Sequence, residues 1–326
     1  MGGMRVCAGI VALGMALLVA GCGDSGGGSG GSGPATLKVG VLPIADVAPL
    51  YLGMKKGYFK QEKLTLKPQV MQGGAAVAAG VVSGSLDFGF SSTEPLIVAK
   101  SKGLPVTIVT QGVQAAASTG EAWEGLMVNG NSPIRSGKDL AGKTIAVNQV
   151  QGMNELTIRA VLARQGIDTS KIKFLEVGFP EMTAALKSGR VDAVSAVEPF
   201  VSQAKAGGAR LVFSPFAGLQ PKLTVATYFT KSDYIAKNAG VVKRFATAMN
   251  KSLSYAQSHP DEVRSVVLSY TKIPPAAAKS MKLPFWSPDL NRPSIELVTA
   301  ETKKVGFAES APSLDELIWK GATGGT

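Results

Sequence analysis

The chain contains one pattern written twice, about 105 residues apart. Residues 83–100 read SGSLDFGFSSTEPLIVAK, and residues 188–205 read SGRVDAVSAVEPFVSQAK. Both segments begin with Ser-Gly, carry an aspartate four residues after the serine, and reach Glu-Pro at nearly the same point, with one residue of displacement. Two copies of one supersecondary unit are the simplest explanation, and this constrains the fold more than any other feature of the chain.

Each copy alternates short β-branched runs with helical runs. The expected strands cover residues 37–42, 64–70 and 86–90 in the first copy and 144–147, 172–177 and 191–196 in the second. Helices are expected over residues 77–82 and 182–187, and a further helix opens at each Glu-Pro. Strands that alternate with helices predict an α/β fold with parallel-rich sheets and helices on both faces. Ligands bind beyond the carboxyl ends of such strands, so two facing units predict a cleft between them.

The segments between and after the copies predict how the two lobes connect. Strands over 105–110 and 125–128 bracket one crossing, and the run LTVATYFTKSDYI predicts a strand that returns. From Ala239 onward the apolar spacing is helical, and we expect these helices to pack on the first lobe. The expected division is residues 36–122 plus 225–326 for lobe 1 and residues 123–224 for lobe 2.

The N-terminal residues have the composition of an export signal. Arg5 precedes an apolar run that ends in small residues and is shorter than the roughly 20 apolar residues of a spanning helix. The end of this run, LVAGC, resembles the lipobox of bacterial lipoproteins, which implies a signal peptide over 1–21 and a lipid anchor on Cys22. The alternative is an ordinary signal with an incidental cysteine. Residues 22–35 then form a Gly/Ser tether, and the protein is exported to the outer face of the cytoplasmic membrane.

Several absences narrow the function. Cleavage of the signal removes Cys7, so no disulfide and no cysteine metal cluster is expected. The single histidine, His259, has no plausible catalytic serine or cysteine partner, so we expect neither an enzyme nor a cofactor nor a metal site. The formal charge of +11 comes from scattered lysines without a basic run, which argues against nucleic acid as a partner. We expect a monomer.

Four segments carry a resemblance to a known family. They are APLYLGMKKGYFKQE at 48–62, SGSLDFG at 83–89, GKDLAGKTIAV at 137–147 and VDAVSAVEPF at 191–200. In this order the chain resembles the substrate-binding proteins of ABC importers for nitrate, alkanesulfonates, taurine and thiamine-precursor pyrimidines. The resemblance implies a two-lobed periplasmic-binding-protein fold of the type II kind, with a hinge and a cleft that closes on a small molecule. It also implies a permease in the membrane as the partner.

Loops after the strands of lobe 1 supply the first group of expected ligand contacts. They are Ile44, Asp46, Gln72, Gly74, Ala75, Ser91, Ser92 and Thr93. Gly74 and Ala75 lie at the start of a helix, where free N–H groups and the helix dipole favour an anionic oxygen. The alternative for this glycine-rich stretch is a tight turn without a ligand.

The second group of expected contacts comes from lobe 2 and the crossing. The loop that matches in the second copy provides Gln151, Gly152, Met153 and Asn154, for which a simple helix cap is the alternative. Glu198 has two interpretations: an acid that starts a helix beside proline, or a carboxylate for an amine or N–H group, which the resemblance favours. Glu94 is expected to start a helix. Gln114 is a further polar candidate, and Tyr51 and Trp123 either stack on a planar ligand or pack in the core.

These observations predict an extracytoplasmic lipoprotein that captures a small anion or zwitterion of the sulfonate, taurine or nitrate type and delivers it to an ABC importer. Helix-start donors favour an anion, whereas Glu198 favours a positive or N–H group. Two alternatives stay open: a binder of an aromatic or pyrimidine ligand, and a ligand sensor for a membrane partner.

Overall fold

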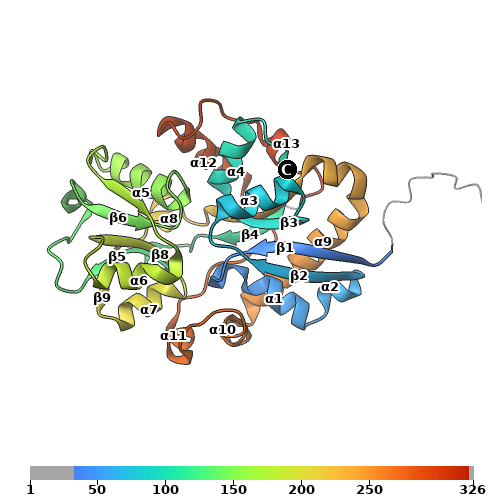
Figure 1. The fold of residues 1–326 in the computed structure, drawn as a ribbon, viewed down its shortest axis with the longest axis horizontal. Coiled ribbons are helices and arrows are strands. Elements are labelled where there is room, and N and C mark those ends of the chain that lie inside the picture. Colours follow the sequence, from blue (N-terminus) through green and yellow to red (C-terminus); the bar gives the residue numbers. More distant parts are fainter. Residues whose placement is uncertain (1–32, 323–326) are drawn as a thin grey trace, which may run out of the picture.

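The computed structural model describes residues 33–322. The expected signal peptide and the lipid anchor at Cys22 lie outside these residues. Two lobes stand side by side, each built on one five-stranded sheet (Figure 1). Within the described residues, no helix has the length and apolar character needed to cross a membrane.

The first sheet has the strand order β2-β1-β3-β10-β4, and the second has the order β7-β6-β8-β5-β9. The strands of the first sheet are β1 (Ala35–Val41), β2 (Leu64–Val70), β3 (Phe88–Ser92), β4 (Val106–Gln114) and β10 (Thr224–Lys231). Those of the second are β5 (Glu124–Asn129), β6 (Thr144–Val147), β7 (Lys173–Glu176), β8 (Ala193–Val197) and β9 (Ala209–Phe213).

Both sheets are mixed, with one reversed strand each, which confirms the expected α/β fold with parallel-rich sheets. In the first sheet, β1 is parallel to β2 and β3, whereas β10 is antiparallel to β3 and β4. In the second, β6 is parallel to β7 and β8, whereas β5 is antiparallel to β8 and β9. The reversed strand in each sheet is the one that arrives from the other lobe. It therefore does not follow a crossover helix of its own lobe, which is the arrangement that makes neighbouring strands parallel.

Helices flank both sheets, and their bounds follow the sequence pattern closely. They are α1 (Ala48–Lys55), α2 (Tyr58–Gln61), α3 (Gly74–Ser83), α4 (Thr93–Ser101), α5 (Met153–Arg164), α6 (Phe179–Lys187), α7 (Phe200–Ala206), α8 (Pro215–Leu219), α9 (Ser232–Ser258), α10 (Pro260–Val267), α11 (Pro275–Ser280), α12 (Arg292–Lys304) and α13 (Leu314–Leu317), with 3-10 helices η1 (Ala45–Val47), η2 (Thr119–Glu121) and η3 (Gly137–Leu140). In Figure 1, α3 and α4 lie above the first sheet and α1 and α2 below it.

The repeated aspartates explain the repeated sequence. The carboxylate of Asp87 accepts the N–H of Lys38 at 2.7 Å, and the carboxylate of Asp192 accepts the N–H of Thr144 at 2.8 Å. In each lobe the aspartate thus ties the loop before the third strand to the first strand. The glycine before it, Gly84 in the first copy, has a φ of +80° that most side chains avoid. The Ser-Gly and Asp of the repeat are therefore structural.

The C-terminal helices connect to both lobes. α9 and α10 pack on α1, and α12 packs on α4, as expected for elements of the first lobe. In addition, α11 packs on α7 and α12 contacts α5, both of which belong to the second half of the repeat. One continuous buried apolar cluster runs through both lobes, and a smaller one lies in the second lobe. The lobes are therefore in apolar contact with each other.

Candidate ligand-binding cleft

A small cavity lies where the carboxyl ends of strands from the two sheets meet. Its walls are Leu42, Ile44, Asp46, Gly74, Phe90, Ser92, Pro95, Asn148, Gln149, Gly152, Met153, Asn154, Phe179, Val197, Phe216 and Val225. Of the expected ligand contacts, this set includes Ile44, Asp46, Gly74, Ser92, Gly152, Met153 and Asn154. The cavity has a volume of about 20 Å³, which is room for about one water molecule. The lobes are therefore closed against each other in this arrangement.

The start of α3 meets the second lobe directly. The N–H of Ala75 donates to the side-chain oxygen Oε1 of Gln149 at 3.2 Å. A side chain on Gly74 would begin 2.9 Å from Ser91 Oγ and 3.4 Å from Gln149 Oε1, so a glycine is needed there. The hydroxyl of Ser91 is fully buried and has no hydrogen-bond partner among the described residues. Free donors of the helix and an unpaired hydroxyl thus converge on an oxygen acceptor from the opposite lobe.

Asp46 is the one ionisable side chain among the residues that line the cavity. It lies on η1, is 3 % exposed, and its Oδ1 has no hydrogen-bond partner among the described residues. Burial raises its pKa to about 8. Its backbone carbonyl accepts the indole N–H of Trp286 at 3.1 Å. The backbone at this position is therefore held firmly, while Oδ1 of the carboxyl group is left without a hydrogen-bond partner among the described residues.

The loop before α5 forms the opposite wall. The side-chain amide of Asn154 donates to the hydroxyl and the carbonyl of Ser195, at 2.8 and 3.1 Å. Gln151 has a φ of +52°, and its N–H donates to the carboxylate of Glu155 at 2.8 Å. Gly152 precedes the first residue of α5. Asn154 is therefore fixed with its amide toward β8, and the Gln151 side chain lines an outer groove rather than the cavity.

Glu198 does not line the cavity. Its carboxylate accepts the N–H and the hydroxyl of Ser202, at 3.0 and 2.8 Å, and the N–H of Lys282 at 3.2 Å. Its backbone carbonyl accepts the N–H of Ala45 at 2.9 Å. Burial raises its pKa to about 7. The Glu198 side chain thus connects α7 to the segment of Lys282, which precedes Phe285. The Glu198 backbone connects to Ala45, in the segment after β1.

Glu94 is the matching acid of the first copy, and it lies in the first turn of α4 as expected. Its side chain is fully buried, and neither carboxylate oxygen has a hydrogen-bond partner among the described residues. Burial and, to a lesser extent, the nearby charge of Glu155 raise its pKa to about 8. Since Glu155 lies on α5, this unpaired acid is located where the two lobes meet.

The other expected contacts surround the cavity without lining it. The hydroxyl of Thr93 donates to the carbonyl of Thr224 at 3.0 Å. Trp123 is fully buried, donates to the carbonyl of Gln114 at 3.0 Å, and meets the edge of Phe216. Tyr51 stacks on Tyr270, with ring centroids 4.0 Å apart. Gln72, together with Ala75, lines a larger polar pocket of about 560 Å³ at the mouth of the cleft. These residues support the walls or the mouth.

Several lining residues carried no usable signal in the sequence. Phe90, Phe179 and Phe216 supply large apolar surfaces to the cavity, and Asn148 and Gln149 supply amides. The two amides stand in the matching loop of the second copy, a few residues before the contacts expected there. Phe179 begins α6 and falls 105 residues after Gly74, which begins α3, so the repeat itself could have pointed to Phe179. Phe216 lies at the start of α8, after the repeated segments. Only the folded chain brings these residues together.

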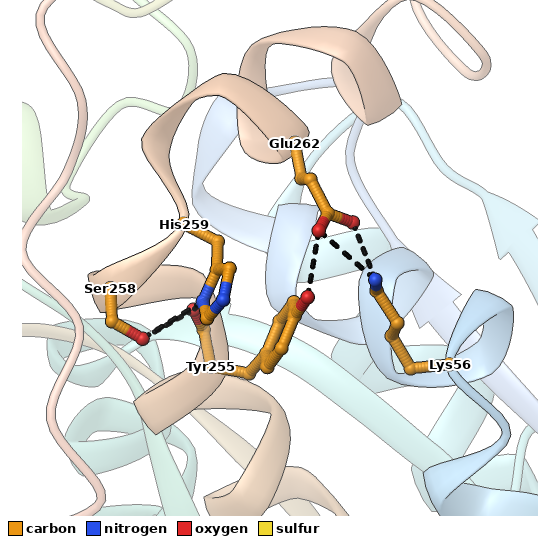
Figure 2. Close-up of polar contacts among 5 residues, drawn as sticks. All are labelled: Lys56, Tyr255, Ser258, His259 and Glu262. Carbon is orange, nitrogen blue, oxygen red and sulfur yellow. Dashed lines mark hydrogen bonds and ion pairs between the residues drawn. The ribbon is translucent and has the colours of Figure 1, made fainter.

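The single histidine lies outside the cleft, in a polar cluster that joins α1, α9 and α10 (Figure 2). Its ring stacks on Tyr255 at 3.7 Å, and Nδ1 lies 2.9 Å from the hydroxyl of Ser258. That hydroxyl also bonds to backbone carbonyls of α9. Glu262 accepts from Lys56 and from the Tyr255 hydroxyl, at 3.0 and 2.7 Å. Through these hydrogen bonds the cluster connects the junction of α9 and α10 to the end of α1. No group of three or more potential metal ligands occurs among residues 33–322.

Comparisons with known proteins agree with this architecture. The taurine-binding periplasmic protein of Escherichia coli (strain K12) is 25% identical over 204 residues, which cover 63% of this chain and 61% of that protein. The formylaminopyrimidine-binding protein of Halalkalibacterium halodurans is 24% identical over 225 residues, which cover 68% of this chain and 65% of that protein. The aligned part thus spans less than two thirds of each of these two relatives.

Solved structures give the same result for the fold. The alkanesulfonate-binding protein SsuA from Xanthomonas axonopodis pv. citri, bound to MOPS, superposes with a TM-score of 0.73 at 20% identity, and the match covers 88% of this chain and 99% of that one. This likeness confirms the two-lobed periplasmic-binding-protein fold. The family model described as NMT1/THI5 like matches residues 44–263. Because this match covers more than half of the sequence, the chain belongs to the NMT1/THI5-like family of substrate-binding proteins.

Proposed function

We propose that this protein is the extracytoplasmic receptor of an ABC importer, and that it captures a small organic anion or zwitterion of the sulfonate or taurine type. The observation that carries the proposal is the cavity at the strand ends, whose walls come from both sheets. A ligand held there contacts both lobes at once and therefore stabilises the closed state. The closed shape is the one that the permease then recognises.

The proposal includes a motion in which each lobe moves as a rigid body relative to the other. Residues 36–122 plus 225–326 form one body and residues 123–224 the other, joined by the two crossings. The present cavity of about 20 Å³ is too small for taurine or any larger solute. In the ligand-bound closed state the lobes therefore stand further apart at the cleft than in the present ligand-free arrangement, and the ligand fills the space between them. Gln149, which now reaches across to Ala75, is the contact that a ligand replaces.

The start of α3 favours an acidic group on the ligand. An anionic oxygen at the position of Gln149 Oε1 accepts from Ala75 and gains the attraction of the helix dipole. Ser91 offers an unpaired hydroxyl beside it. Arg, Lys and His do not occur among the lining residues of the cavity. Neutral donors therefore hold the anion, which suits a singly charged sulfonate or carboxylate.

An aromatic or pyrimidine ligand is the second candidate, and the cavity walls favour it. Phe90, Phe179, Phe216 and Met153 provide apolar faces on several sides of the cavity. Planar rings bury their faces well between such side chains. A small inorganic ion such as nitrate makes no use of these walls.

Attachment to the membrane through Cys22 and a permease partner belong to the same proposal. The lipobox-like LVAGC and the glycine-rich segment after it support a tethered receptor. Replacement of Cys22 by Ser is expected to release the protein from the membrane fraction.

A thermal-shift screen of the purified protein tests the ligand class. The panel contains alkanesulfonates, taurine, nitrate, aromatic acids, pyrimidines and thiamine precursors. A ligand at a hundred times its dissociation constant adds about 2.7 kcal/mol to the free energy of unfolding, which raises the melting temperature by several degrees. A selective shift by one class supports uptake of that class. If the whole panel leaves the melting temperature unchanged, the proposed ligand class is wrong.

A further inference from the structure

Asp46 differs from Glu198 and Glu124 in what its carboxylate contacts. The carboxylate of Glu198 accepts three hydrogen bonds, and that of Glu124 accepts the N–H groups of Phe216 and Ala217 at 3.2 and 3.3 Å. Asp46 is 3 % exposed and leaves Oδ1 without a partner among the described residues. Glu94 also has carboxylate oxygens without a partner, but of these acids Asp46 is the one that lines the cavity.

The surroundings of Asp46 hold its backbone in place. The indole of Trp286 donates to the Asp46 carbonyl, and the hydroxyl of Tyr270 donates to the neighbouring carbonyl of Ile44 at 3.0 Å. Tyr270 is itself stacked on Tyr51. Such support is what a recognition residue needs, since the position of its carboxylate is fixed before a ligand arrives.

An unpaired buried carboxylate is costly for a folded protein. Removing a carboxylate oxygen from water without supplying a new hydrogen-bond donor costs several kcal/mol, unless the group takes up a proton. The pKa of Asp46, raised by burial to about 8, reflects this cost. A donor supplied by a ligand removes it, whereas a ligand with only acceptors at this end makes it worse.

We infer that Asp46 selects the cargo by binding a protonated amine or an N–H group of the ligand. The inference rests on the proposed function and narrows its ligand class. The cargo carries a nitrogen donor at the Asp46 end and an acceptor oxygen at the α3 start, where Gly74 borders the same cavity. Its body lies against Phe90 and Phe216, whose rings also attract a cation. Zwitterions and amino-substituted heteroaromatics fit this description, whereas nitrate and simple alkanesulfonates do not.

Matched pairs of compounds test this selection. The pairs differ by one amine: taurine against isethionate, and benzylamine against benzyl alcohol. Calorimetry at pH 7 measures their affinity for the wild-type protein, for Asp46→Asn and for Asp289→Asn, which removes an exposed aspartate outside the cavity. We expect at least one amine to bind ten times more tightly than its hydroxyl partner. Asp46→Asn abolishes this preference, and Asp289→Asn keeps it.

Other outcomes contradict the inference in distinguishable ways. If nitrate or ethanesulfonate binds and no amine binds more tightly than its hydroxyl partner, the result supports uptake of an anion and contradicts the inferred role of Asp46. An amine preference that survives in Asp46→Asn has the same consequence. If the wild-type protein binds none of the compounds, both the inference and the proposed ligand class fail.

A measurement without ligand checks the same carboxylate. At pH 9 the wild-type protein carries a buried unpaired charge that Asp46→Asn lacks, so the variant is expected to melt several degrees higher than the wild type at pH 9. Below about pH 3.8, the ordinary pKa of the group, the two melting temperatures are expected to agree, because the folded and unfolded forms of the wild type then bind the same number of protons at this site. Equal melting temperatures at both pH values contradict an unpaired Asp46.

Discussion

Glu198 and Glu94 occupy matching places in the repeated sequence, yet their carboxylates differ in their partners. Glu198 accepts three hydrogen bonds, from Ser202 and Lys282, whereas both oxygens of Glu94 lack a partner among the described residues. The glutamate of the Glu-Pro dipeptide is therefore hydrogen-bonded to neighbouring segments in one lobe and lacks hydrogen-bond partners in the other. The sequence predicts the helix start in both copies. One difference is local, since Ser202 donates its hydroxyl to Glu198 from four residues further along, where the first copy has Val98. The donor Lys282 is far away in the chain and carries no sign in the sequence.

Replacement of Glu198 by Ala tests whether the three hydrogen bonds to its carboxylate stabilise the folded protein. The change leaves the buried N–H of Ser202 and the partly buried N–H of Lys282 without this acceptor, which costs about 1 to 3 kcal/mol. Thermal unfolding without ligand is expected to show a melting temperature several degrees lower. Glu296→Ala, at an exposed position of α12, serves as the control and is expected to melt like the wild type. A Glu198→Gln variant that loses amine binding with no change in melting temperature would instead place Glu198 at the ligand.

Among the elements, one strand of each copy was predictable to the residue, and the strand that starts the first copy was expected at 37–42 and spans Ala35–Val41. The expected ranges 64–70 and 144–147 coincide with β2 and β6. The sequence did not reveal β9, whose residues are half-exposed at the edge of the second sheet, so its apolar pattern is weak. Nor did it reveal the reversed direction of β5 and β10, because direction depends on which lobe the chain has just left. The lining residue Phe179 could have been found from the repeat, because it matches Gly74 at the offset of 105 residues, whereas Phe216 lies beyond the repeated segments.

The hydrogen bond between Ala75 on α3 and Gln149 in the loop before α5 is expected to act as a latch, which means that it holds the ligand-free lobes closed. Gln149→Ala removes the acceptor for the Ala75 N–H, and one such hydrogen bond contributes about 1 kcal/mol. We expect the ligand-free variant to populate the open form about fivefold more than the wild type, which small-angle X-ray scattering detects as a larger radius of gyration. The control is Gln69→Ala, at an exposed site on β2. Scattering curves of Gln149→Ala that match the wild type would contradict the latch.

At the scale of the whole molecule, closure brings two acids of different lobes together. Glu94 lies on α4 of the first lobe and Glu155 on α5 of the second, and these helices are in contact. Glu155 already has partners in Gln151 and Arg159. Opening the cleft separates α4 from α5 and returns Glu94 to water, where its pKa falls back toward its ordinary value of 4.5. Closing is thereby linked to the uptake of a proton by Glu94.

The sign of this linkage gives a pH dependence. The pKa of Glu94 is about 8 in the closed form, because burial and the charge of Glu155 disfavour ionisation, and Lys102 offsets this only in part. The closed form therefore binds more protons than the open or unfolded form between about pH 4.5 and 8. Its stability is fully present below pH 4.5 and falls as the pH rises through 8. Asp46, Glu124 and Glu198 have raised pKa values in the same range, so the wild-type profile sums four groups.

Glu94→Gln isolates the contribution of that one acid, because the amide stays neutral at every pH. We expect the radius of gyration of the ligand-free wild type to grow between pH 5 and 9, and the growth to be clearly smaller in Glu94→Gln. The melting temperature of the variant is expected to exceed that of the wild type at pH 9 by several degrees and to match it near pH 4.5. Glu296→Gln, on the exposed side of α12, is the control for the loss of a charge and is expected to follow the wild type. A Glu94→Gln profile that parallels the wild type from pH 5 to 9 would show that closure takes up its protons elsewhere.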